Sequence, residues 1–226
     1  MSRSTPVGTA KFITLEGIEG AGKSTLAQFA SAWLGRHGIA VRLTREPGGT
    51  PLAERVRQIV LERGAEPVSP LTETLLMFAA RALHVENVIR PALARGEWVV
   101  CDRFTDATRA YQGSGRGVDA ALIDALALAV HGDLKPDCTL LLDVPVRAGL
   151  ARARARPGAA ATADRFEAET LGFFEKVRAG YLALARREPQ RFRIVDAAAP
   201  LAEVEQRIAE ALGALRTQGG GREQHG

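Results

Sequence analysis

Short runs of apolar residues alternate along the chain with longer stretches in which apolar residues recur every three or four positions. The runs predict strands and the stretches predict helices. Strands are expected at 11–16, 39–44, 97–101, 138–143 and 192–196, and helices near 22–36, 51–63, 70–95, 118–131, 146–156, 166–187 and 200–215. Such alternation is typical of βαβ units around a parallel sheet, with helices on both faces. The pattern predicts an α/β fold whose ligands bind beyond the carboxyl ends of the strands.

Composition supports one globular domain. The 226 residues are 46% hydrophobic and 25% charged, which excludes a disordered chain, a collagen-like repeat and a disulfide scaffold. This length suits a single α/β domain, which we expect at 11–216, between a flexible N-terminus at 1–10 and a disordered tail at 217–226. The start of the chain does not resemble a signal peptide, and no apolar run approaches the ~18 residues of a membrane helix. Cys101 and Cys138 lie in separate apolar runs and predict reduced core residues of a cytoplasmic protein.

Charge raises the question of a polyanionic partner. The net charge is +4, and lysine occurs only at Lys11, Lys23, Lys135 and Lys176, so arginine supplies most of the positive charge. The guanidinium fork suits phosphate, although an arginine- and alanine-biased genome would give the same composition. No basic stripe interleaved with aromatic residues, of the kind that follows a polynucleotide, is present. We therefore expect neither nucleic acid nor a membrane as a partner.

The strongest motif is GIEGAGKS at 17–24, which matches G-x-x-x-x-G-K-[ST] between a predicted strand and a predicted helix. Glycines allow backbone N–H groups to surround a phosphate at a helix N-terminus. Lys23 is expected to reach the β- and γ-phosphates, and the Ser24 hydroxyl to bind Mg²⁺. A glycine-rich turn without a ligand is the alternative. The predicted ATP-binding residues are Gly17, Ile18, Glu19, Gly20, Ala21, Gly22, Lys23 and Ser24.

Two aspartates follow apolar strands. Asp102 comes directly after Trp98-Val99-Val100-Cys101, where a second carboxylate is expected to orient the water shell of the metal. A surface aspartate at a strand end is the alternative for Asp102. Asp143 has a similar position with less context, and we expect it to be structural.

Three classes of protein share this phosphate-binding loop: switch GTPases, ATP-driven motors and small-molecule kinases. A GTPase would normally carry N-K-x-D, but the only asparagine is Asn87, within Glu86-Asn87-Val88. A motor would need further domains. A kinase needs a second phosphate site, and Arg45 and Arg103 follow the second and third predicted strands, where they could hold an acceptor phosphate. For each arginine alone, a solvated surface position is the default.

Several segments together resemble the bacterial thymidylate kinases: GIEGAGKS, TREPGG, LLMFAARALH, CDRFTDATRAYQGSGRG and RARAR followed by DRFE. The resemblance covers residues 11–213 in the order of the family. It implies a P-loop kinase fold with a mobile lid, and phosphorylation of dTMP to dTDP by ATP with Mg²⁺ for dTTP biosynthesis. It also implies a homodimer.

The resemblance assigns roles to acceptor-site residues. Arg45 and Arg103 match the pair that holds the dTMP phosphate, and Glu19 matches an acidic residue near the acceptor sugar and metal. The remaining matches concern the nucleoside: Phe78 stacks on thymine, Arg81 reaches the pyrimidine carbonyl edge, Thr108 and Gln112 contact the base, and Tyr111 crowds a ribose 2′-hydroxyl. Without the family, Phe78 would be read as a core side chain.

The lid is expected at about 152–166. The P-loop carries no arginine, so Arg152, Arg154 and Arg156 resemble the arginine-bearing lid of the bacterial type. We favour Arg152 and Arg156, four residues apart on one helix face, over Arg154, with a solvated helix face as the alternative. Two features depart from the family pattern: an insertion at 157–163, and Arg109, which we expect to point to solvent.

These inferences give a catalytic set of Lys23, Arg45, Asp102, Arg103, Arg152 and Arg156, with Ser24 and Asp102 at the metal. The alternatives are another nucleoside or nucleotide kinase and, from a different class, a nucleotide-dependent switch or binding module.

Overall fold

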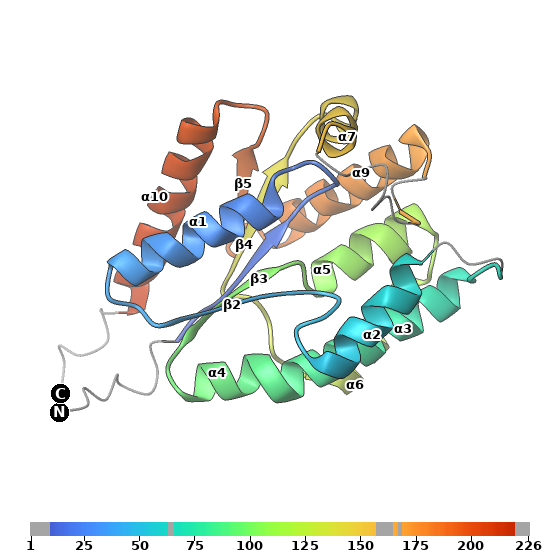
Figure 1. Ribbon diagram of the computed structural model, residues 1–226, viewed down its shortest axis with the longest axis horizontal. Coiled ribbons are helices and arrows are strands. Elements are labelled where there is room, and N and C mark those ends of the chain that lie inside the picture. Colours follow the sequence, from blue (N-terminus) through green and yellow to red (C-terminus); the bar gives the residue numbers. More distant parts are fainter. Residues whose placement is uncertain (1–9, 63–65, 157–164, 167–168, 220–226) are drawn as a thin grey trace.

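A computed structural model describes residues 10–62, 66–156, 165–166 and 169–219 (Figure 1). Its centre is a parallel sheet of five strands in the order β2-β3-β1-β4-β5. The strands are β1 (Phe12–Glu16), β2 (Val41–Arg45), β3 (Trp98–Asp102), β4 (Cys138–Asp143) and β5 (Phe192–Asp196). The predicted α/β fold with a five-stranded parallel sheet is confirmed.

Helices cover both faces of the sheet. On one face α1 (Lys23–Arg36) and α10 (Leu201–Gly219) pack against each other, with α1 over β1, β2 and β3. On the other face α4 (Arg90–Ala94) lies against β3, and α9 (Leu171–Arg187) lies against β4 and β5. Because both faces are covered, β1 is buried along its whole length, whereas the edge strand β2 is half exposed.

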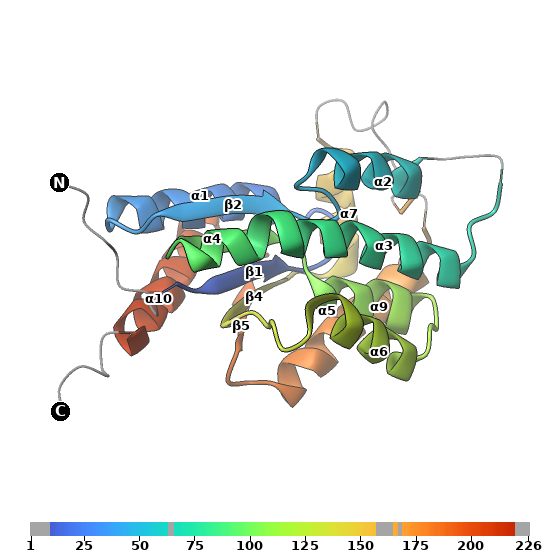
Figure 2. The ribbon, with the colours of Figure 1, turned by 90° about the horizontal axis from the view of Figure 1, so that it is seen from below.

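The remaining helices extend beyond the carboxyl edge of the sheet. They are α2 (Pro51–Leu61), α3 (Pro70–His84), α6 (Ala120–His131) and α7 (Val146–Arg154). Helix α3 is the long central helix in Figure 2, and it packs against both α2 and α6. This arrangement places a wall of helices opposite the P-loop.

Capping residues fix several helix starts. Thr50 and Ser69 each accept a backbone N–H at the start of α2 and α3, and proline follows both. Asp119 caps α6 and Thr170 caps α9, so these helices begin at 120 and 171 rather than at 118 and 166. The caps explain these differences from the periodicity.

The segment predicted as a helix at 70–95 is helical from Pro70 to Ala94, but it is not α-helical throughout. Helix α3 ends at His84, a π-helical turn covers Val85–Ile89, and α4 follows. Pro91 has no amide hydrogen, and its ring crowds the carbonyl four residues earlier, so a widened turn comes before it.

Two further predictions of secondary structure were wrong. Residues 105–115 are helical, as α5 (Thr105–Thr108) and the π-helical segment η2 (Arg109–Gly115), where no helix was predicted. A Cβ on Gly115 would lie 2.6 Å from the Phe173 ring, so glycine allows η2 and α9 to approach closely. Helix α10 continues to Gly219, so residues 217–219 do not belong to a disordered tail. The expectations for 1–9 and 220–226 lie outside the described residues.

Two expectations from composition can be compared with the structure. Cys101 and Cys138 are buried and free, as predicted. Within the described residues, no helix combines the length and apolarity that a membrane span requires.

Candidate active site

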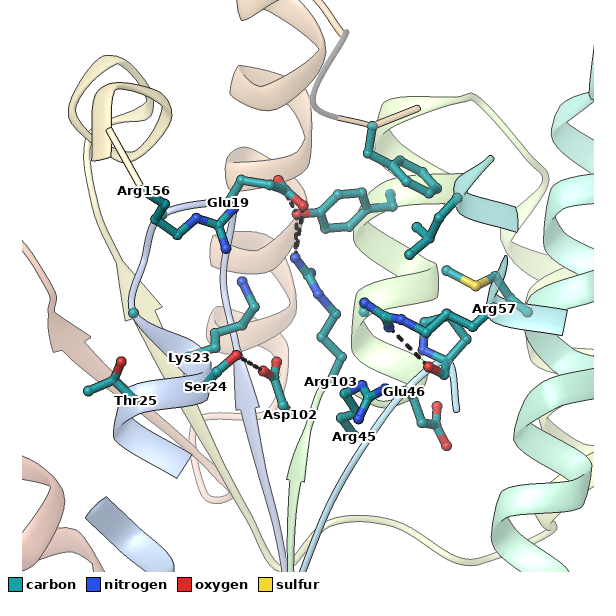
Figure 3. Close-up of a pocket in the computed structure, with 18 of the residues that line it drawn as sticks. Glu19, Lys23, Ser24, Thr25, Arg45, Glu46, Arg57, Asp102, Arg103 and Arg156 are labelled. Atoms are coloured by element: carbon teal, nitrogen blue, oxygen red, sulfur yellow. Dashed lines mark hydrogen bonds and ion pairs between the residues drawn. The ribbon is translucent and has the colours of Figure 1, made fainter. Parts of the chain in front are cut away.

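A cavity of about 450 Å³ opens at the carboxyl edge of the sheet (Figure 3). Strand register brings its parts together, because Leu15 pairs with Asp102 and Arg45 also pairs with Asp102. The P-loop after β1, Arg45 at the end of β2 and Arg103 after β3 therefore meet at one place. Polar groups that line the cavity come from the P-loop, these strand ends, α2 and the region of α7: Glu19, Lys23, Ser24, Thr25, Arg45, Glu46, Arg57, Asp102, Arg103, Arg152 and Arg156.

The P-loop is held in the conformation that its glycines allow. Gly17, Gly20 and Gly22 all have positive φ angles, and a Cβ on Gly20 would lie 1.8 Å from the carbonyl oxygen of Gly149. Lys23 donates to the carbonyl oxygens of Gly17 and Ile18, at 3.1 and 2.8 Å. Burial, followed by the charge of Arg103, lowers the pKa of Lys23 to about 8. The lysine thus lies inside the loop, near its phosphate-facing surface.

Ser24 and Asp102 are adjacent. The Ser24 hydroxyl donates to Asp102 Oδ2 at 2.8 Å, which joins the start of α1 to the end of β3 (Figure 3). A hydroxyl and a carboxylate are oxygen ligands of the type that Mg²⁺ takes. Among the described residues, no group of three or more histidine, cysteine, aspartate or glutamate residues is arranged to hold a metal. Mg²⁺ commonly uses one or two protein oxygens with phosphates and water, so this pair fits the ion.

Arg103 is held in place through both its backbone and its side chain. Its φ angle is 75°, which is rare outside glycine and marks strain at a functional position. Its guanidinium donates to Glu19 and to the Tyr111 hydroxyl, both at 3.0 Å, and to the Tyr181 hydroxyl at 3.3 Å. Although burial opposes the charge, these oxygens raise the pKa of Arg103 above its ordinary value. Arg103 therefore presents a fixed positive charge next to the P-loop.

Comparisons with known proteins agree with this geometry. The family model of thymidylate kinase matches residues 15–208. Thymidylate kinase from Pseudomonas fluorescens is 56% identical over 207 residues, 92% of this chain and 97% of that protein. The protein of the same name from Pseudomonas syringae pv. syringae is 59% identical over 197 residues, 87% of this chain and 92% of its own length. The chain belongs to the thymidylate kinase family.

A solved relative shares the fold. The crystal structure of thymidylate kinase from Ehrlichia chaffeensis superposes with a TM-score of 0.71 at 34% identity, covering 90% of this chain and 98% of that one. The enzyme is thus a bacterial thymidylate kinase, a phosphotransferase that converts dTMP to dTDP with ATP. The activity expected from the sequence is confirmed.

In this thymidylate kinase, the residues that were predicted to contact the base form a buried layer behind the cavity lining, Tyr111 excepted. Arg81 Nε lies 2.7 Å from Glu46 Oε2, and His84 Nδ1 lies 2.9 Å from Glu46 Oε1. Burial opposes the charge of Glu46, but Arg81 and His84 outweigh it and lower the pKa of that carboxyl. The Phe78 ring lies under the Arg81 guanidinium at 4.8 Å and packs with Ile123. Phe78 and Arg81 do not line the cavity, and neither do Thr108 and Gln112, whereas Tyr111 does.

The three arginines of the predicted lid differ in position. Arg152 and Arg156 line the cavity of the thymidylate kinase, and Arg154 does not. Arg152 donates to the carbonyl oxygen of Ala197 at 2.6 Å, and Arg156 Nε donates to that of Ala153. Helix α7 ends at Arg154, so Arg156 follows the helix rather than continuing it. The expected insertion at 157–163 and Asp164 lie outside the described residues.

Two side expectations can now be assessed. Asp143 lies outside the cavity lining and forms a two-point ion pair with Arg178, at 2.6 and 2.8 Å, as a structural residue would. Arg109 was expected to point to solvent. Instead, it forms ion pairs with Asp124 at 2.9 Å and with Asp106. Arg109 therefore ties η2 to α6.

Among the described residues that line the cavity, one cation was not predicted from the sequence. Arg57 of α2 lines the cavity and donates to the Pro47 carbonyl oxygen at 3.0 Å (Figure 3). Burial, followed by the charge of Arg45, lowers the pKa of Arg57. The available signal was its helix position, because Arg57 shares one face of α2 with the buried Ala53 and Val60. Because a charged side chain is rarely buried without a polar partner, an arginine on an otherwise apolar helix face is a candidate site residue.

Proposed function

We propose that this enzyme, as one nucleotide kinase domain over about 11–216, binds ATP on the P-loop and the dTMP phosphate between Arg45, Arg57 and Arg103. The observation that carries the proposal is that the P-loop lysine and these arginines line the same cavity. The phosphates of ATP and dTMP must lie close together for phosphoryl transfer. Both are negatively charged, and the guanidinium groups neutralise that charge.

Catalysis in this arrangement is mainly positioning. The attacking oxygen of the dTMP phosphate is already anionic, so no general base is needed. Arg103 holds that phosphate while Glu19 and Tyr111 hold Arg103, at 3.0 Å each. Lys23 would leave the carbonyl oxygens of Gly17 and Ile18 to bind the β- and γ-phosphates of ATP. Ser24 and Asp102 would hold Mg²⁺, which neutralises phosphate charge when bound.

Base recognition is supported by buried polar atoms that lack partners. Among the described residues these include Arg81 Nη1, Thr108 Oγ1 and Gln112 Oε1. A buried polar group without a partner costs free energy, so these three atoms favour a ligand that supplies the missing hydrogen bonds. Phe78 lies below Arg81 and would stack on the base only after a rearrangement, since its ring is 2% exposed.

We assign to the lid the positive charge that stabilises the transferring phosphoryl group. The P-loop has no arginine between Gly17 and Lys23, and Arg152 and Arg156 line the cavity from the region of α7. This combination supports the subtype in which lid arginines, rather than a P-loop arginine, stabilise the transferring group. Such an arginine is worth ~10³–10⁵ in rate in related phosphoryl-transfer enzymes.

A homodimer is supported by one apolar surface. Leu71 and Leu75 of α3 and Leu122 and Leu128 of α6 are all exposed, and the two helices pack side by side (Figure 2). We call these four residues the α3–α6 apolar surface. Clustered exposed leucines are typical of an interface, so two copies are proposed to meet here.

Single alanine substitutions in the lid test the proposed site. Arg152→Ala or Arg156→Ala should lower kcat by at least about a hundredfold, because the charge on the transferring phosphoryl group is lost. Arg154→Ala is the matched control and should keep kcat within about threefold, since Arg154 does not line the cavity. The measurement is steady-state ADP release with saturating dTMP and ATP. Equal, small effects of all three changes would refute the lid assignment.

A further inference from the structure

Behind the cavity wall, a buried carboxylate joins three segments of the chain. Glu73 of α3 is 1% exposed and accepts a hydrogen bond from Gln112 Nε2 at 2.7 Å. Its other oxygen lies 2.7 Å from Arg165 Nη2 and 3.4 Å from Arg116 Nη2. Glu73 itself does not line the cavity. The carboxylate can therefore affect a substrate in the cavity only through the side chains that it contacts.

The contact with Glu73 determines which way the Gln112 amide faces. A carboxylate that forms ion pairs with two guanidinium groups offers only acceptor oxygens. The amide of Gln112 can therefore turn only its NH₂ group toward Glu73, and its oxygen must face the opposite way. That oxygen is buried and has no partner in the structure. Glu73 thus leaves a buried hydrogen-bond acceptor available for another molecule.

This acceptor lies directly behind residues that line the cavity. Thr108 and Gln112 are one helical turn apart, and their neighbours Ala107 and Tyr111 line the cavity. On α3, Glu73 and Arg81 lie one turn before and one turn after Met77, which also lines it. The unpartnered atoms of Arg81, Thr108 and Gln112 therefore come from the two helical faces that bound this wall.

The polarity of these atoms matches an imide. Thymine and uracil present a carbonyl acceptor at position 4 next to an N3–H donor. Arg81 Nη1 is a donor and Gln112 Oε1 is an acceptor, so the pair complements this edge. Cytosine presents an amino donor at position 4 next to an N3 acceptor, the reverse pattern. Each group of cytosine would face a group of the same kind, which leaves both unpaired.

We infer that Glu73 is a positioning residue that fixes the Gln112 amide, so that the site accepts bases with an N3–H group and rejects cytosine. The inference rests on the proposed assignment of Gln112 to the acceptor base. Arg116 and Arg165 hold the Glu73 carboxylate by pairing with it. Glu169 pairs with Arg116 at 2.6 Å.

The test compares Glu73→Gln with Glu169→Gln. A glutamine at 73 can donate or accept, so the Gln112 amide loses its fixed orientation. The ratio of kcat/KM for dTMP to that for dCMP should fall at least about tenfold in Glu73→Gln and stay within about twofold in Glu169→Gln. The ratio of dTMP to dUMP should not change in either variant, because both bases carry the same imide.

Gln112→Leu separates the failure of this inference from that of the proposed site. If Gln112→Leu lowers the preference for dTMP over dCMP and Glu73→Gln does not, Glu73 does not orient the amide. If neither variant lowers it, Gln112 does not read the base and both proposals fail.

A measurement on the unaltered enzyme covers the case in which Glu73→Gln does not fold. The side-chain amide signal of Gln112, assigned by its loss in Gln112→Leu, should exchange with solvent at least about a hundredfold more slowly than that of an exposed glutamine. Exchange as fast as in the exposed Gln58 and Gln206 would overturn the inference.

Discussion

At the scale of single residues, the site depends on arginines held by neighbouring oxygens. Arg103 is fixed by Glu19, Tyr111 and Tyr181, and Tyr181 in turn donates to the buried Glu16 at 2.8 Å. Long cationic side chains lose rotamer freedom when they bind, so fixing them before the substrate arrives reduces that loss. Sequence patterns could name these arginines, but could not show which oxygens hold them.

Arg57→Ala should raise the KM for dTMP by about tenfold or more, because it removes one of the three cations proposed to bind the acceptor phosphate. The KM for ATP should change little. Arg55→Ala is the matched control, since Arg55 is exposed on the same helix and does not line the cavity. Steady-state kinetics with each substrate varied in turn would measure both constants. An Arg57 variant that behaves like the Arg55 variant would place the acceptor phosphate elsewhere.

Glu16 should make stability depend on pH. Burial, followed by the charge of Asp106, raises the pKa of Glu16 from 4.5 to about 8. Between these values the folded state binds a proton that the unfolded state has lost, so this contribution is complete below about pH 4.5 and is lost as the pH rises through about 8. Relative to Glu16→Gln, the wild type should therefore lose about 1 kcal/mol or more between about pH 5 and pH 8.5.

Urea unfolding at the two pH values would measure this difference. Glu203→Gln provides the control, because it replaces an exposed carboxylate by the same side chain. A pH-independent difference between Glu16→Gln and wild type would mean that Glu16 does not titrate in this window.

At the scale of elements, close packing without side chains connects the P-loop to α7. The carbonyl oxygen of Gly149 would lie 1.8 Å from a Cβ on Gly20, and a Cβ on Gly149 would lie 2.7 Å from the carbonyl oxygen of Glu19. Two glycines thus allow the helix that carries Arg152 to lie directly on the phosphate-binding loop. The periodicity predicted α7, but only the fold shows this contact.

Gly149→Ala should displace the P-loop or α7, since the atom nearest to the new Cβ is the backbone carbonyl oxygen of Glu19. We expect a loss of about 1–3 kcal/mol in the free energy of unfolding, together with a higher KM for ATP. Gly35→Ala is the matched control, because Gly35 lies within α1 and a Cβ there would meet nothing within 4 Å. The control should be stabilised by about 0.5–1 kcal/mol. Thermal unfolding and ATP kinetics measure both effects, and equal behaviour of the two variants would contradict the packing argument.

At the scale of the whole molecule, the helices beyond the sheet both enclose the cavity and carry the α3–α6 apolar surface. The inner side of α3 bears Met77 and Arg81, and its outer side bears Leu71 and Leu75. A partner on the outer side would therefore stabilise the wall of the acceptor site. In the proposed dimer, assembly would therefore affect binding without any shared residue.

Leu128→Arg should convert a dimer into monomers, because Leu128 is 68% exposed on α6 and a buried arginine without a partner is costly. Leu201→Arg is the control, since Leu201 is 55% exposed on α10, which lies on the other side of the molecule (Figure 1). Light scattering coupled to gel filtration would give the masses. A dimeric Leu128→Arg enzyme would exclude this surface as the interface.

Local sequence determined most of the architecture. Hydrophobic periodicity predicted all five strands to within about two residues, and the P-loop motif identified the nucleotide loop, because both depend on interactions between neighbours in the chain. The hydrophobic periodicity failed to predict the helix at 105–115. Glycines and serine disfavour a helix there locally, but they permit the close contact with α9 that stabilises this helix. Helix boundaries also depended on caps, as at Thr170, which the periodicity does not register.

The tertiary structure alone decided what surrounds each charge. Strand register brought Arg45 and Asp102 together, and the packing of α2 added Arg57 to the cavity. The position of Glu73 beside Gln112 depends on the meeting of α3 and η2, 39 residues apart in the sequence. A sequence specifies which side chains carry charge, but the burial and the partners that set their pKa values and orientations arise only from contacts between distant segments.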